Sequence, residues 1–440
     1  MNAKRVLTMM LMSLVLLLAS VSAFAYVSDR MDFGDIDFGG ATVSFVMHYD
    51  AIAQFEEGGA KAGMLEEAKE LFNIGDFEKV VVGWGEVGDT ALNRFLAGES
   101  TYDLWRVPFA YYWGLASRGA LYPVNEILPE EYFDQLPMIT RDRNHELSYK
   151  GQMYQFSAGV DDYGHATFVV FNRDLIDAEG LEDPYELYEN GEWTFEKVTE
   201  MARKATKDTD GDGVIDQFGL SDVEPKNLVY AYGGAVTRRD ENGRVYFSMD
   251  EPEAVAGLRQ WIDWYKVDQI GSPTALASGG EAEFGAGKYA IAFLPMYAIG
   301  NHQDWPFTHG ILPFPQGPYT DEPLFLPGAA DAWFVPANAE YPLELIALDN
   351  FLFSLDSYYE DLDNYIAGRI ADRKSYEILY DAVENFWPED YYMNFIGGRW
   401  DGDSPYGKVC GEINSGVSPA TATAEVKDAA QAIIDEMFEQ

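Results

Sequence analysis

Aromatic rings stand beside charged side chains at several points where the sequence predicts the end of a strand. The chain has 10 Trp, 28 Tyr and 27 Phe among its 440 residues. A ring can stack on the apolar C–H face of a sugar, while carboxylates, amides and backbone groups bind the hydroxyls around it. On this chemistry we predict a carbohydrate pocket. The residues we expect to line it are Asp50, Trp84, Asp161, Asp162, Tyr163, Tyr232, Gly233, Tyr297, Asp331, Trp333 and Trp400.

Each of these rings has a competing explanation, because most aromatic residues in a folded protein fill its core. We favour the core for aromatic residues in general and the pocket for rings at strand ends. Asp331 and Trp333 are two positions apart on a predicted strand, so their side chains share a face. Tyr232, beside Gly233, is the ring we expect from another strand-end loop.

An acidic loop at 208–216 matches the first nine positions of a calcium-binding loop. Its pattern has carboxylates at positions 1, 3, 5 and 9, glycine at 6 and a backbone carbonyl at 7. Position 12 is Gly219, where such a loop has a bidentate Glu, so an ordinary Asp/Gly turn is the alternative. The predicted ligands of a structural Ca²⁺ are Asp208, Asp210, Asp212, Val214 and Asp216. We expect no other cofactor.

The sequence lacks the usual signatures of an enzyme. It has no Gly-x-Ser-x-Gly, no phosphate-binding Walker loop and no His-Glu-x-x-His, and its 5 His residues show no metal-ligand spacing. Paired carboxylates such as Asp161 and Asp162 could serve a glycosidase, but 74 acidic residues make adjacent pairs unremarkable. We therefore expect a binding protein, with a secreted carbohydrate-active enzyme as the alternative.

Charge restricts the partners of the chain. The 74 acidic and 30 basic residues give a formal net charge of −44 at pH 7. Such a surface repels the phosphates of nucleic acids and anionic lipids. The sequence shows no Lys/Arg cluster that would form a pocket for a strongly anionic ligand. We expect a monomer that binds no nucleic acid.

The first 25 residues have the organisation of a cleavable signal peptide. Lys4 and Arg5 precede an apolar run at 6–18, and Ala23-Phe24-Ala25 has the small-x-small pattern of a cleavage site. The only cysteine is Cys410, so no cysteine follows the signal to carry a lipid anchor. We predict a soluble protein of the periplasm of a bacterium with two membranes.

Short apolar runs alternate with amphipathic segments along the chain. Apolar runs at 42–47, 79–82 and 168–171 read as strands, and 60–72 and 89–97 as helices. This alternation is typical of an α/β fold with doubly wound, mainly parallel sheets. A further helix follows Thr194, its expected N-cap, with an inward face formed by Phe195, Val198, Met201, Ala202 and Ala205.

Several phrases resemble the family 1 extracellular solute-binding proteins, the sugar-binding components of ABC transporters. These phrases keep the family's order over most of the chain after the signal peptide. They are Phe171-Asn172-Arg173-Asp174-Leu175, Gly180-Leu181-Glu182-Asp183-Pro184, Gly191-Glu192-Trp193-Thr194, Asp210-Gly211-Asp212-Gly213, Phe284-Gly285-Ala286-Gly287-Lys288 and Ser415-Gly416-Val417-Ser418-Pro419-Ala420.

The resemblance implies a two-lobe, type II-like periplasmic binding protein fold, with a ligand cleft between the lobes and closure by hinge bending. We expect the N-terminal lobe to hold 26–157 and 285–328, and the C-terminal lobe 158–284 and 329–440. The implied function is to capture a sugar or oligosaccharide and deliver it to the permease subunits of an ABC transporter. A polyol or a glycoside is the alternative ligand. Residues that the resemblance favours for the site are Asp162, Tyr232, Gly233, Asp331 and Trp333.

Overall fold

The computed structural model describes residues 25–98, 102–158, 164–272, 281–300, 305–326, 328, 331–370, 372–382, 385, 390, 396–399 and 401–438.

The first lobe is built on a four-stranded sheet. The strand order is β12-β5-β3-β4. The strands are β3 (Thr42–Met47), β4 (Asp76–Val81), β5 (Leu104–Pro108) and β12 (Asp331–Phe334). Strand β3 runs parallel to both β4 and β5, whereas β12 is antiparallel to β5.

Helices cover this sheet because their apolar residues recur on one face. In α2 (Met64–Phe72), the residues Leu65, Ala68 and Phe72 are buried at helical spacing. Packed around the sheet are β1 (Ala25–Val27), β2 (Asp32–Asp35), η1 (Ala53–Phe55), α3 (Val87–Leu96), α4 (Phe109–Ser117), η2 (Val124–Glu126), α5 (Glu130–Asp134), α6 (Met138–Glu146) and α15 (Pro342–Leu352).

The second lobe is built on a sheet with the strand order β11-β6-β10-β7. Its strands are β6 (Thr167–Asn172), β7 (Phe218–Leu220), β10 (Tyr289–Pro295) and β11 (His309–Leu312). Strands β6 and β10 are almost continuously buried, as expected for strands covered on both faces. The surrounding elements are α8 (Arg173–Ala178), α9 (Pro184–Glu189), α10 (Phe195–Ala205), α11 (Pro225–Ala231), β8 (Thr237–Arg239), β9 (Val245–Phe247), α12 (Pro252–Ile262), the π-helical turn η3 (Asp263–Val267), α13 (Glu281–Gly285), α14 (Met296–Gly300), α17 (Arg373–Ala382), α18 (Pro405–Asn414) and α19 (Pro419–Phe438).

The two-lobe α/β architecture agrees with the prediction, but three strands join the sheet opposite to the one predicted. We expected β10 and β11 in the first lobe and β12 in the second. Instead β10 and β11 pair with β6, and β12 pairs with β5. The predicted allocation of 285–328 and 329–440 is therefore wrong for these strands. An apolar run identifies a buried strand, but its hydrogen-bond partners are distant in sequence and leave no local signal.

The second sheet also departs from the expected parallel arrangement. Strand β10 is parallel to β7, yet β6 is antiparallel to both β10 and β11. The helix prediction for 195–205 is confirmed in detail. The Thr194 hydroxyl accepts a hydrogen bond from the Lys197 backbone N–H, which caps α10, and all five predicted inward residues are buried.

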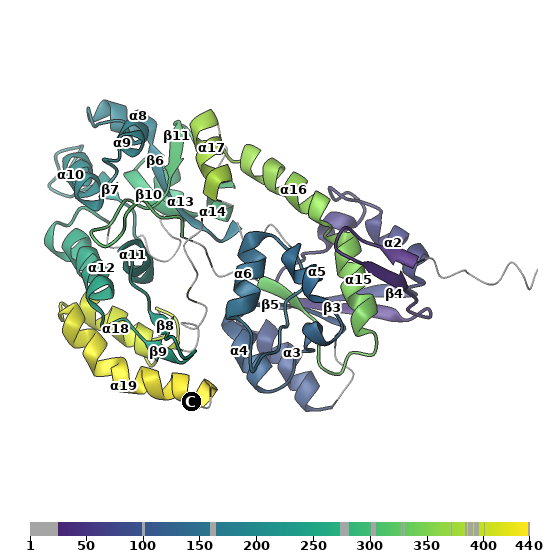
Figure 1. Cartoon of the computed structure of the whole chain (residues 1–440). Coiled ribbons are helices and arrows are strands. Elements are labelled where there is room, and N and C mark those ends of the chain that lie inside the picture. The colour runs from purple at the N-terminus through teal and green to yellow at the C-terminus, as the bar shows by residue number, and fades with distance from the viewer. Residues whose placement is uncertain are drawn as a thin grey trace, which may run out of the picture.

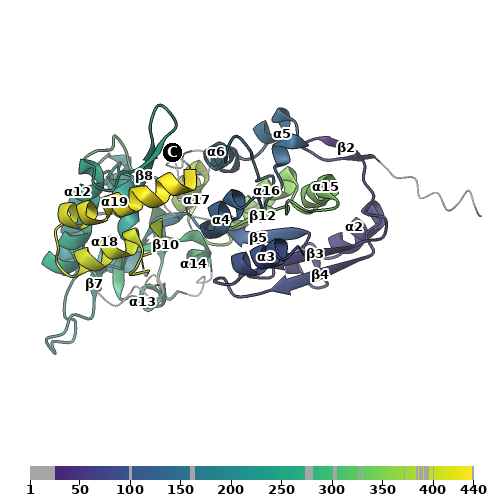
Figure 2. The ribbon, with the colours of Figure 1, turned by 90° about the horizontal axis from the view of Figure 1, so that it is seen from below.

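The carboxyl ends of the parallel strands in each sheet lie toward the other lobe (Figures 1 and 2). Leu326 bridges Thr167 at this edge of the second sheet, and Asp331 pairs with Pro108 at the matching edge of the first. Five residue steps span at most about 18 Å, so the two edges are close where the chain crosses. Helix α16 (Leu355–Ala367) extends from α15 toward α17 beside them.

None of the described helices combines the length and apolar character that crossing a membrane would require.

Candidate functional site

The interlobe edge of the first lobe is organised around the guanidinium of Arg106. This group lies 4.7 Å from the centre of the Tyr49 ring and 5.7 Å from that of Trp333. One of its nitrogens is 3.6 Å from Asp331 Oδ2, and His48 Nε2 is 3.5 Å from the same oxygen. Two cationic or potentially cationic groups therefore converge on the buried Asp331 carboxylate and fix it at the start of β12.

A hollow of about 220 Å³ opens beside Arg106, next to Ala158 where the chain leaves the first lobe. Asp50 contributes to its wall and is held by Lys79, whose Nζ is 2.5 Å from Asp50 Oδ2. Tyr49 and the first turn of α16 complete the wall. The predicted residue Asp50 thus lies at the interlobe edge. Beside it are the Tyr49 ring and the Arg106 guanidinium, which can donate hydrogen bonds to hydroxyl oxygens.

Trp333 belongs to the core of the first lobe. Its side chain is only 3% exposed, and its ring packs against Phe45 and Phe353 at centroid distances of 5.7 and 6.2 Å. Arg106 touches both Asp331 and Trp333, so the expectation that these two residues share a face is correct. That face is covered, however, and the ring is placed for packing rather than for stacking on a ligand.

The interlobe edge of the second lobe carries a buried ion pair that sequence reasoning missed. Asp222 follows β7, and Arg399 donates a hydrogen bond of 2.9 Å to its Oδ2. Arg399 also lies 3.4 Å from Glu224 Oε2, and the Tyr406 hydroxyl donates to Glu224 Oε1. Burial raises the pKa of Asp222 to about 7, opposed by the charge of Arg399. The feature of the sequence that could have identified Asp222 is its position two residues after the end of a strand.

Two of the predicted rings are exposed at these edges, one on each lobe. Trp84 follows β4 and is 56% exposed; its backbone carbonyl accepts a hydrogen bond from the Tyr111 hydroxyl. Tyr297 follows β10, is 47% exposed and packs beside His165. Trp84 lies three residues and Tyr297 two residues after the carboxyl end of a strand, where ligands collect in α/β sheets.

Comparisons with known proteins agree with this two-lobe arrangement. The sequence pattern of a family described as bacterial extracellular solute-binding protein matches residues 57–357. The chain belongs to this family. A comparison with curated protein sequences finds no match.

Solved structures similar to this solute-binding protein share its fold at low sequence identity. An ABC substrate-binding protein from Listeria monocytogenes in complex with cycloalternan is 15% identical with a TM-score of 0.65, covering 91% of this chain and 99% of its own. A maltose/maltodextrin-binding domain from Bdellovibrio bacteriovorus bound to maltotriose is 18% identical with a TM-score of 0.64, covering 91% and 100%. UgpB from Mycobacterium tuberculosis, in complex with glycerophosphocholine, is 14% identical with a TM-score of 0.64, covering 90% and 99%.

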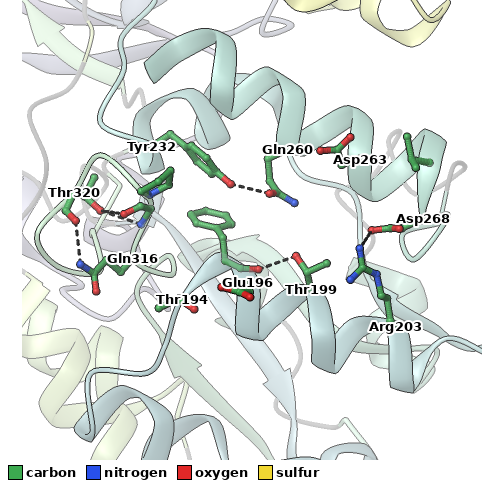
Figure 3. A pocket seen from close by; sticks show the side chains of 14 residues that line it. Thr194, Glu196, Thr199, Arg203, Tyr232, Gln260, Asp263, Asp268, Gln316 and Thr320 are labelled. Carbon is green, nitrogen blue, oxygen red and sulfur yellow. Dashed lines mark hydrogen bonds and ion pairs between the residues drawn. The ribbon is translucent and has the colours of Figure 1, made fainter. Parts of the chain in front are cut away.

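Tyr232 and Gly233 lie in a different part of this solute-binding protein. Tyr232 follows α11 and lines a cavity of about 700 Å³ whose lining residues all belong to the second lobe (Figure 3). Its hydroxyl donates to Gln260 Oε1 at 2.7 Å, and its ring packs on Phe195. The expectation that Tyr232 joins Asp331 and Trp333 in one pocket is therefore wrong. Tyr232 ends a helix, and the loop was misassigned to a strand end.

The acidic loop lies between α10 and β7, and three of its carboxylates converge. One ligand oxygen from each of Asp208, Asp210 and Asp212 lies within 4.8 Å of the others. Asp208 accepts hydrogen bonds from the N–H groups of Gly211 and Gly213, and these bonds lower its pKa. Asp216 instead accepts from the backbone N–H and hydroxyl of Thr209. The converging donor set is thus smaller than the predicted one, and Ca²⁺ binding stays a prediction.

Other predicted residues fall outside the part of the chain that the structure describes. These are Asp161, Asp162, Tyr163 and Trp400, together with residues 1–24 of the predicted signal peptide.

Proposed function

We propose that this solute-binding protein captures a neutral sugar or oligosaccharide between its lobes and delivers it to the permease of an ABC transporter. The observation that carries the proposal is the pair of exposed rings, Trp84 and Tyr297, at the carboxyl edges of the two sheets. Hinge closure would bring such rings toward opposite faces of one ligand.

Polar groups at each interlobe edge support a hydroxylated ligand. Asp50 and Arg106 border the hollow in the first lobe, and Asp222 and Arg399 lie at the edge of the second. Carboxylates accept hydrogen bonds from sugar hydroxyls, and guanidinium groups donate to them. Within each edge a cation stands next to a carboxylate, so the site balances its own charges and suits an uncharged ligand.

The ligands bound to the structural neighbours include sugars and one compound that is not a sugar. Cycloalternan and maltotriose are oligosaccharides, whereas glycerophosphocholine is not a sugar. We therefore keep a polyol or a glycoside as the second candidate. The proposal has three further parts. The protein is exported into the periplasm through a cleavable signal peptide, it is a monomer, and it has no catalytic activity.

Isothermal titration of the mature chain against mono- and oligosaccharides tests the proposal. We expect one-to-one binding of at least one sugar, and chromatography should recover that sugar intact. Trp84→Ala and Tyr297→Ala should each weaken binding about tenfold, which corresponds to about 1.4 kcal/mol. Tyr380→Ala is the matched control, because Tyr380 is 49% exposed on α17 and is not part of either edge.

Cleavage of the sugar would instead support the enzyme alternative. Binding that is unaffected by either ring substitution would place the ligand elsewhere and overturn the site.

A further inference from the structure

The 700 Å³ cavity that contains Tyr232 is larger than the hollow at the first-lobe edge and is separate from both edges. Its wall is formed by one side of α10, the end of α11, the end of α12 with η3, and the loop at 316–320 (Figure 3). No residue of the first lobe is among its lining residues in the described part of the chain. Lobe closure therefore does not create this cavity.

A π-helical turn shapes one side of the cavity. Helix α12 continues into η3, where the Asp268 N–H donates to the Asp263 carbonyl at 2.8 Å. Turns of this type are uncommon and occur frequently at functional sites. Asp263, Val267 and Asp268 all line the cavity as a result.

The cavity wall carries more negative than positive charge. Its ionisable groups are Glu196, Arg203, Asp263 and Asp268. Arg203 is paired with Asp268 at 2.6 Å. Among the described residues, neither Asp263 nor Glu196 has a cation within ion-pair distance. Burial raises the pKa of Asp263, an effect that the charge of Arg259 opposes and that of Asp268 reinforces. A partly buried carboxylate in this setting gains stability from an incoming positive charge.

Hydrogen bonds within the wall use up most of its neutral donors. The Tyr232 hydroxyl donates to Gln260, and the Thr199 hydroxyl donates to the Phe195 carbonyl. The side-chain amide of Gln316 donates to the Thr320 carbonyl at 3.0 Å. The carboxylates of Asp263 and Glu196 and the Gln316 side-chain oxygen accept no hydrogen bond from the described residues. A ligand that donates hydrogen bonds therefore fits this cavity better than one that accepts them.

We propose that this cavity is a second binding site, specific for a small organic ammonium ion. Asp263 and Glu196 supply the counter-charge, and the rings of Phe195 and Tyr232 form an aromatic floor that favours a cation. The site acts independently of the sugar site between the lobes.

The test is titration calorimetry of the mature chain with 1,4-diaminobutane at low ionic strength, with 1,4-butanediol as the uncharged analogue. We expect saturable binding of the diamine and none of the diol. Asp263→Asn should weaken diamine binding at least tenfold. Asp428→Asn removes the same charge from an exposed position on α19 and should leave diamine binding unchanged.

Three results would overturn the proposal. They are the absence of saturable diamine binding, equal binding of the diol, and equal weakening by Asp263→Asn and Asp428→Asn, which would indicate general attraction to an acidic surface. Thermal unfolding checks that Asp263→Asn is folded, and Glu196→Gln provides a second variant with the same expected loss. Sugar affinity should be the same in all these variants, which separates this test from that of the interlobe site.

Discussion

Replacing Trp333 with alanine separates a core role from a ligand-binding role. The ring is 3% exposed and packs on Phe45 and Phe353, so its removal leaves a cavity in the first lobe. Losses of this kind cost about 3 to 5 kcal/mol. For a unit of roughly 200 residues, this cost lowers the melting temperature by about 6 to 20 °C. Arg106 also loses the ring that lies 5.7 Å from its guanidinium.

The assay pairs thermal unfolding, followed by circular dichroism without sugar, with calorimetric titration at a temperature where the variant is folded. Trp333→Ala should unfold early yet keep most of its sugar affinity. Trp84→Ala is the matched control, since that ring is 56% exposed; it should change the unfolding free energy by no more than about 0.5 kcal/mol and lose affinity. If Trp333→Ala kept its stability and lost affinity, the core assignment would be refuted and the original site prediction restored.

Three further predictions address the acidic loop, pH and export. If Asp208, Asp210 and Asp212 hold Ca²⁺, a chelator should lower the melting temperature and added Ca²⁺ restore it; no change in a metal-loaded sample leaves an ordinary turn. Burial raises the pKa of Asp349 to about 7 from its usual 3.8, so the folded state holds this proton more tightly and stability should fall as pH rises through this interval. Asp349→Asn should flatten that slope in urea titrations, and an unchanged slope would contradict the assignment. Mass spectrometry of osmotic-shock extracts should find a mature chain that begins at Tyr26, whereas recovery only from membranes with the signal retained would contradict export.

Local features of the sequence predicted local features of the structure. The cap at Thr194 and the buried face of α10 follow from residue spacing, because each depends on neighbours a few positions away. The aromatic residues after β4 and β10 were also found, since an apolar run followed by Gly or a ring marks a strand end. Trp84 and Tyr297 are indeed exposed there.

Features that depend on distant contacts were not predictable in the same way. Trp84 and Trp333 both belong to strand-end segments, yet one is exposed and the other is covered by Phe353 from a segment near the start of α16. Asp222 and Arg399 are 177 positions apart, and no spacing rule connects them. The sheet to which β10 and β12 belong depends on pairing across similar distances.

The pairing of β12 with β5 has a consequence for how the chain folds. Asp331 joins Pro108 only after 223 further residues have been added, and the strands of the second sheet all lie between these two positions. As the chain emerges from N- to C-terminus, every strand of the second sheet is available before the first sheet can be completed. The strands of the second sheet can therefore pair before those of the first sheet are complete. A chain that stops before residue 331 leaves β5 as an exposed edge strand that can pair with other chains.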